Sequence, residues 1–171
     1  MKNIIKYFAL AVVILGFSAT SFGQSTANAP TSAIIITPIT LNKTVDMNFG
    51  NVAVNASLGT VILVPAGTRS ATGGVTLPVV TGTFTAATFT VAGEGTSTYS
   101  ITLPAAPLTI TRVSGTETMT VGTFTSTPSG TGTLSDGAQT ITVGATLNVA
   151  GSQVAGTYTN AVGFAVTVNY N

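Results

Sequence analysis

The sequence predicts an all-β protein folded as an antiparallel β-sandwich of about eight to ten short strands. Threonine accounts for 34 of the 171 residues and glycine for 19, whereas the helix formers Glu, Lys, Gln and Arg are scarce. Branching at Cβ disfavours helices and suits a pleated sheet that is buried on one face. Apolar and polar residues also alternate with the period of a strand, as in Ile141, Val143, Ala145, Leu147 and Val149.

Each expected strand is a β-branched or apolar run closed by a turn signal such as Gly73-Gly74 or Asp136-Gly137. The first run contains Pro38, which cannot donate to a ladder, so this strand belongs at a sheet edge or where the chain changes sheets. A closed barrel or a β-solenoid is the structural alternative, but a solenoid needs a fixed repeat and the Gly and Thr clusters show none. The expected strands are residues 33–41, 45–52, 60–64, 75–80, 83–92, 98–103, 108–113, 119–125, 139–149 and 157–170.

Residues 1–23 have the pattern of a secretory signal peptide. Lys2 and Lys6 precede the apolar run Ala9–Phe17, and small residues before Gln24 form a cleavage site. A membrane anchor would need about 20 apolar residues, and this run is much shorter. The sequence therefore predicts an exported protein of the periplasm, cell surface or medium, with a flexible leader at 24–32 and one domain at 33–171.

The charge pattern excludes several classes of function. Only 5% of the residues are charged, and the sequence contains no His and no Cys. Zinc centres of the usual kind, Ser-His-Asp machinery and disulfides are therefore excluded. A net charge of +1 is too small for a nucleic-acid binder. We expect no catalytic, cofactor-binding or metal-binding residue, because the four acids Asp46, Glu94, Glu117 and Asp136 stand far apart in turn-like contexts.

Two other features, a single lysine and a set of alternating threonines, are weak indications of a specific function. Lys43 is the one lysine beyond the signal segment, and either a solvated loop residue or an isopeptide crosslink would account for it. Ice-binding surfaces use alternating threonines, but such threonines are also common on the solvent-exposed face of an ordinary strand. The threonines in question are Thr81, Thr83, Thr85, Thr88, Thr90, Thr123, Thr125 and Thr127.

The C-terminal residues form an alternating apolar pattern that continues to the last position but one. Phe164, Val166, Val168 and Tyr170 fall on one face of a strand. This strand is either the last strand of the core or a strand offered to an assembly chaperone that adds its own edge.

The chain as a whole resembles a known bacterial family. The residues that carry the resemblance are Asp46-Met47-Asn48-Phe49-Gly50, Gly59-Thr60-Val61 to Arg69, Gly73-Gly74-Val75, Phe89-Thr90-Val91-Ala92-Gly93, Tyr99-Ser100-Ile101-Thr102-Leu103-Pro104, Val143-Gly144-Ala145-Thr146-Leu147, and Gly156-Thr157-Tyr158 to Val166-Thr167-Val168-Asn169-Tyr170. They are similar to those of the bacterial domain of unknown function family 4402. That family is similar to the spore coat protein U family and to the pilins of archaic chaperone–usher pili.

The resemblance implies an immunoglobulin-like sandwich that serves as a structural or adhesive surface subunit, with no enzymatic activity. Its partners would be copies of itself or related subunits and a periplasmic chaperone. In such pilins one strand is missing and a neighbour's N-terminal extension replaces it. Residues 25–41 would then be the donor, with Ile35, Ile39 and Leu41 on the inserted face. A complete sandwich would instead indicate a self-contained secreted binding module for a glycan or an ice surface.

Overall fold

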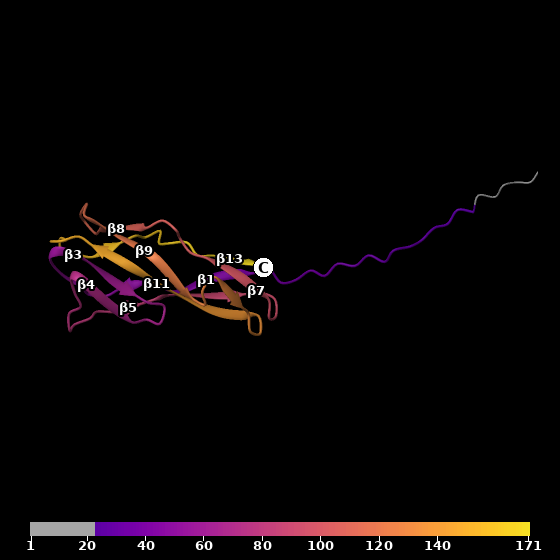
Figure 1. Cartoon of the computed structure of the whole chain (residues 1–171), viewed down its shortest axis with the longest axis horizontal. Helices are drawn as coiled ribbons and strands as arrows, with labels where there is room; N and C mark the ends of the chain where they lie inside the picture. Colours follow the sequence, from indigo (N-terminus) through magenta and orange to yellow (C-terminus); the bar gives the residue numbers. More distant parts are fainter. Residues whose placement is uncertain (1–22) are drawn as a thin grey trace, which may run out of the picture. The chain divides into compact units, whose positions relative to one another are not determined.

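The computed structural model describes residues 23–171, so the predicted signal peptide lies outside the described residues apart from Gly23. Within 23–171 every regular element is a β-strand and every strand pairing is antiparallel, which confirms the predicted all-β class. The chain divides at Ile35/Ile36, and all thirteen strands belong to the compact unit 36–171 (Figure 1). None of these residues forms a helix long and apolar enough to cross a membrane.

Eight strands form the largest sheet, in the order β1-β6-β11-β9-β8-β12, with β3 between β11 and β4. Three strands form a second sheet in the order β10-β7-β13, and two short strands form a third. The strands of the largest sheet are β1 (Thr40–Val45), β3 (Ala53–Leu63), β4 (Arg69–Thr76), β6 (Ala87–Ala92), β8 (Leu108–Arg112), β9 (Thr118–Thr127), β11 (Ala138–Val149) and β12 (Tyr158–Thr159). The others are β7 (Thr98–Thr102), β10 (Thr131–Thr133) and β13 (Thr167–Tyr170), and β2 (Asn48–Phe49) with β5 (Phe84–Thr85).

The 12-residue strand β11 organises the large sheet by changing partners along one of its edges. Its first half pairs with β6 as far as Val143, and its second half pairs with β3 from Ala145 onward. β9 pairs with β11 across this junction, on the opposite edge. Gly144 stands at the junction. The sheet therefore has two halves, β1–β6 and β3–β4, that share β11 and β9.

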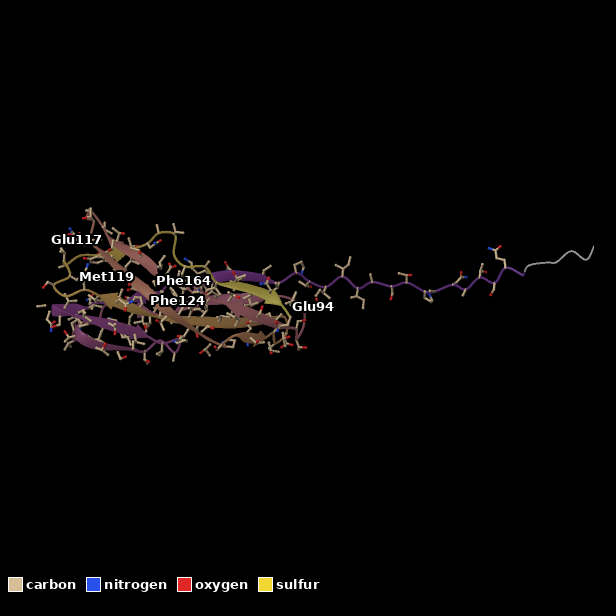
Figure 2. All side chains as sticks on the ribbon, turned by 45° about the horizontal axis from the view of Figure 1, so that its top comes forward. Glu94, Glu117, Met119, Phe124 and Phe164 are labelled. Carbon is tan, nitrogen blue, oxygen red and sulfur yellow. The ribbon has the colours of Figure 1, made fainter. Side chains whose placement is uncertain are left out.

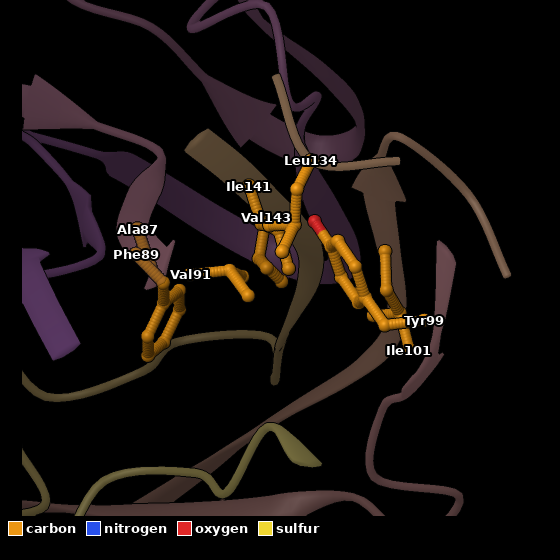
Figure 3. Packing of buried hydrophobic residues seen from close by; sticks show 8 residues of the cluster. All are labelled: Ala87, Phe89, Val91, Tyr99, Ile101, Leu134, Ile141 and Val143. Carbon is orange, nitrogen blue, oxygen red and sulfur yellow. The ribbon is translucent and has the colours of Figure 1, made fainter. Parts of the chain in front are cut away.

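Two apolar clusters fill the interior. The first joins the β6–β11 half of the large sheet to β7 of the three-stranded sheet, which is consistent with the predicted sandwich (Figure 3). The second lies on the β3–β4 half. The first cluster consists of Ala87, Phe89, Val91, Tyr99, Ile101, Leu134, Ile141 and Val143, and the second of Val61, Val75, Val121, Ala145, Leu147 and Val149.

Several expected strand boundaries are wrong, and local chemistry explains them. The expected strand 33–41 is regular only from Thr40, because Pro38 has no N–H for a ladder. The strand expected over 157–170 is broken between β12 and β13, where Asn160 Oδ1 accepts the N–H groups of Val162 and Gly163. The strand expected over 45–52 is reduced to β2, and Gly50 ends it with a φ of 68°. β10 and most of β4 were not predicted.

Candidate functional site: an open seam between two edge strands

The four residues of the predicted C-terminal strand all face inward. Val168 and Tyr170 belong to β13, Phe164 and Val166 precede it, and all four are half-buried against the first cluster. The Phe164 ring centre lies 4.8 Å from that of Phe124 and 6.1 Å from that of Phe89 (Figure 2). The predicted alternation is therefore present, and this strand contributes to the chain's own core.

β13 also presents an unpaired edge. It pairs only with β7 among the described strands. Asn171 N–H donates to Thr98 O at 3.2 Å, and the antiparallel register then places the backbone groups of Asn169 and Thr167 toward β7 as well. The N–H and C=O groups of Val168 and Tyr170 point to the opposite, free edge. No charged residue and no proline lies on β13 to protect this edge, and β1 is its neighbour on that side.

The predicted donor residues do not stay together in the structure. Ile39 and Leu41 are half-buried against the first cluster of their own chain, and Leu41 lies opposite Val91 in the β1–β6 ladder. Ile35, in contrast, is 97% exposed, with Ile34 91% and Ile36 49% exposed. The structure therefore separates an exposed run of three isoleucines from a strand that the domain keeps.

β1 and β13 lie next to each other at one side of the first cluster (Figure 2). Each is the last strand of its own sheet. The cluster members on β6, β7 and β11 are buried, whereas Ile39, Leu41, Val166 and Val168 on this side are only half-buried. We call this side, defined by those four residues and the free edge of β13, the seam. The apolar core is thus incompletely covered along the seam, as it also is at Phe124 and Leu103.

A shallow, mostly apolar groove also reaches Phe164. Its lining residues come from the end of β7, the start of β8 and the segment before β13, and they include Leu103, Pro104, Pro107 and Leu108. No charged side chain contributes to this groove. Its chemistry suits an apolar or backbone contact rather than an ionic ligand.

A set of hydrogen bonds fastens the end of the seam where β1 begins. Tyr170 Oη donates to Thr37 O at 2.8 Å and accepts the Glu94 N–H at 2.6 Å. Thr37 N–H in turn donates to Glu94 Oε2 at 3.0 Å. This bond from Thr37 lowers the pKa of Glu94, because it stabilises the charged carboxylate. We call Thr37, Glu94 and Tyr170 the latch. Sequence reasoning placed Glu94 in an ordinary loop and missed the latch, since its members are far apart in the chain.

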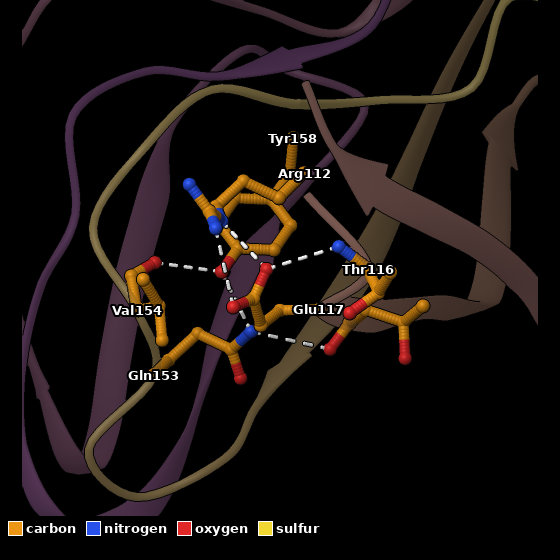
Figure 4. A network of polar contacts seen from close by, with 7 residues as sticks. Arg112, Thr116, Glu117, Gln153, Val154 and Tyr158 are labelled. Atoms are coloured by element: carbon orange, nitrogen blue, oxygen red, sulfur yellow. Dashed lines mark hydrogen bonds and ion pairs between the residues drawn. The ribbon is translucent and has the colours of Figure 1, made fainter. Parts of the chain in front are cut away.

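Of the three remaining acids, Glu117 and Asp46 form ion pairs and Asp136 lies in a turn. Arg112 Nε donates to Glu117 Oε2 at 2.6 Å, and Nη2 donates to Oε1 at 3.2 Å (Figure 4). The bonds from Arg112 lower the pKa of Glu117 to about 2. Lys43 is on strand β1 rather than in a loop, and it forms an exposed ion pair with Asp46. Asp136 is in a tight turn with a φ of 51°. In residues 23–171 no three acidic side chains gather as a metal site would require.

Arg69 organises the end of the domain near β2 and β5. Its guanidinium donates to the carbonyl oxygens of Phe49, Asn51 and Thr81, the last two at 3.0 Å. The guanidinium carbon also lies 4.5 Å from the centre of the Phe84 ring, in a cation–π contact. Three backbone acceptors on one guanidinium are typical of a structural role, because they hold separate loops together.

Threonines form a broad polar surface on the outer face of the large sheet. One cross-strand row runs over β4, β3, β11, β9 and β8, and its members are Thr72, Thr60, Asn148, Thr120 and Thr109. Thr60 and Thr72 share a 2.7 Å hydroxyl hydrogen bond. The next row is interrupted by Ile62 and Gly122. Tyr99 is buried in the core and Tyr170 is part of the latch, so neither of these two tyrosines adds a stacking platform for sugars to this face.

These observations define an all-β antiparallel domain. The sequence model of the family described as Domain of unknown function (DUF4402) matches residues 39–170, and the chain belongs to this family. The match begins one residue before β1 and ends with β13, so it covers the whole stranded domain and leaves out the exposed isoleucines at 34–36. Searches of curated proteins and of solved structures find no significant match.

Proposed function

We propose that this protein is an exported, non-enzymatic structural subunit of a surface fibre or coat, pilin-like or coat-like, that assembles by β-strand addition. The observation that carries the proposal is the seam. Two neighbouring edge strands leave apolar residues of the core half-covered, and the backbone groups of Val168 and Tyr170 are free to pair. A strand added there would satisfy those groups and cover apolar side chains at once.

The proposed donor is residues 33–36 of a second copy. Ile34 and Ile36 would share one face of an added strand, with Ile35 on the other. Three consecutive exposed isoleucines are unusual in a soluble chain, and covering them removes apolar surface from water. This donor is shorter than residues 25–41, because Ile39 and Leu41 already pack in their own domain.

Export rests on the signal-peptide pattern at 1–23, which precedes the described residues. Before assembly, the free edge of β13 would need cover, because an uncharged open edge promotes aggregation. A periplasmic chaperone that pairs with β13 would supply that cover in the cell.

The test is to express the full chain in a bacterial periplasm without partners, and to measure its mass by light scattering. We expect polymers, and we expect the variant Ile34→Ser/Ile35→Ser/Ile36→Ser to be monomeric. A matched control is Val79→Ser/Val80→Ser, which changes a loop whose valines are 100% and 75% exposed. A parent chain that is a stable monomer, or a control that also abolishes polymers, would contradict the proposal.

The acceptor edge has its own test. The backbone N–H of Val168 faces away from β7, and the Val168→Pro variant removes it. The Val168→Ala variant keeps this N–H but loses more side-chain packing than the proline variant does. Strand addition at β13 predicts that the proline variant stops polymerisation and the alanine variant does not. Equal polymerisation of the two variants would place the acceptor elsewhere.

A second candidate is a self-contained binding module for ice or a glycan, and the cross-strand row of four threonines and Asn148 favours its ice-binding form. Polar side chains spaced by the strand repeat offer regular hydrogen bonding. Thermal hysteresis of the monomeric chain would support this candidate, and loss of hysteresis in a Thr60→Val/Thr120→Val variant would locate it.

A further inference from the structure

The latch satisfies both backbone groups of Thr37 just before β1 begins. Thr37 C=O accepts from the Tyr170 hydroxyl, and Thr37 N–H donates to the Glu94 carboxylate. The next residue is Pro38, which has no N–H, and the β1–β6 ladder starts only at Thr40. No strand pairing therefore holds residues 37–39, and the latch is the hydrogen-bonded fastening at this end of β1.

The latch also lies at a chemical boundary in the chain. Before it stand Ile34, Ile35 and Ile36, which are exposed, and after it stand Ile39 and Leu41, which pack into the core. β1 is an edge strand with β6 as its one ladder partner. Such a strand can detach from its end and exchange with another copy unless that end is fixed.

We propose that Thr37, Glu94 and Tyr170 are positioning residues that set the point at which the donated segment ends and the retained strand begins. This inference rests on the proposed function. With the latch closed, a subunit donates residues up to Ile36 and keeps β1 in its own domain. With the latch open, β1 is exchanged together with the isoleucines, and the assembly loses its fixed register.

Gly93 supports the same assignment. A Cβ at this position would lie 3.1 Å from Tyr170 Cζ and would clash with the Tyr170 hydroxyl oxygen. Gly93 does not have a positive φ, so its backbone accepts an L residue. The absence of a side chain is thus required by the approach of Tyr170, together with Leu134 Cδ1 at 3.1 Å, rather than by the turn. Gly93→Ala should therefore open the latch without removing any of its polar groups.

The first test is amide hydrogen exchange, followed by mass spectrometry, on the full chain and three variants. Tyr170→Phe and Gly93→Ala should each speed exchange at Thr37, whose N–H donates to Glu94, by at least tenfold. The matched control is Tyr158→Phe, since Tyr158 Oη likewise donates to a carbonyl, Val154 O at 2.6 Å, and accepts from Gln153 at 2.8 Å. The control should leave exchange at 37–39 within twofold of the parent, and unchanged exchange in both latch variants would overturn the inference.

The second test reports strand exchange directly. Asn42 and Thr90 are opposite each other in the β1–β6 ladder, so an Asn42→Cys/Thr90→Cys pair can form a disulfide. In the parent and in Tyr158→Phe the disulfide should form within one chain. In Tyr170→Phe a substantial share should form between chains, and a purely intrachain disulfide there would refute the positioning role.

The two proposals fail in different ways. If the parent chain is monomeric and the triple isoleucine variant behaves identically, strand donation fails, although the exchange rates at 37–39 still report whether the latch holds β1. If polymers form as expected but Tyr170→Phe retains intrachain disulfides and slow exchange, strand donation stands and the positioning role fails.

Discussion

Gly144 lies where β11 passes from β6 to β3, and an alanine at this position tests that junction. A Cβ on Gly144 would lie 2.7 Å from Val64 C and 2.8 Å from Pro65 N, and closer still to the Leu63 carbonyl oxygen. All three atoms belong to the backbone, so no side chain can rotate away. The end of β3 must therefore move for the variant to fold.

The matched control is Gly122→Ala on β9. Gly122 is also a buried glycine of the large sheet, but its Cβ would contact Pro107 at 3.5 Å, an ordinary van der Waals distance. Replacing glycine by alanine at a compatible strand position stabilises by about 0.5–1 kcal/mol through the unfolded chain. The control should therefore be as stable as the parent or slightly more stable.

For Gly144→Ala the stabilisation that alanine brings through the unfolded chain is opposed by overpacking in the folded state, which typically costs about 1–3 kcal/mol. Because the obstructing atoms are backbone, we expect the upper part of this range and a gap of about 2–3 kcal/mol between the two variants. Equilibrium urea unfolding measures this gap directly, with an unchanged m-value. Two variants within about 0.5 kcal/mol of each other would refute the assignment of Gly144 as the crossing point.

Three further predictions concern stability. Arg112 lowers the pKa of Glu117 from 4.5 to about 2, so between these pH values the folded state binds fewer protons than the unfolded chain, and the stability of the fold should decrease as the pH drops from about 4.5 toward 2. Thermal unfolding across this range should show a smaller decrease in stability for Glu117→Gln than for the parent. An equal decrease in both proteins would contradict the role of the Arg112–Glu117 pair. Arg69→Lys should cost about 1–3 kcal/mol, since a lysine cannot donate to three separate carbonyls in the same fork geometry; urea unfolding equal to that of the parent would show that the contacts are dispensable. Leu134→Ala should cost about 2–5 kcal/mol, because Leu134 is 1% exposed in the first cluster, and a loss below about 1 kcal/mol would mean that the cluster collapses around the gap.

The sequence alone determined the class of the fold. Branched residues and period-2 alternation are local properties, so the runs that became β7, β8 and β11 could be located almost to the residue, whereas the single strand expected over 83–92 is divided into β5 and β6. The inward set Phe164, Val166, Val168 and Tyr170 followed from the same alternation. The family resemblance was likewise carried by short local motifs, and the match over residues 39–170 confirms the family.

The tertiary structure alone decided which strand edges remain free and which residues meet across the chain. β11 changes partners at Gly144 because the end of β3 crosses there, and no local pattern encodes that crossing. The latch joins Thr37 to Tyr170 across 133 residues. The retained Ile39 and the exposed Ile35 are both isoleucines in one apolar run, and they differ only in whether a sheet lies against them. Burial depends on the neighbours that folding brings together, so it is the property that a single sequence conveys least.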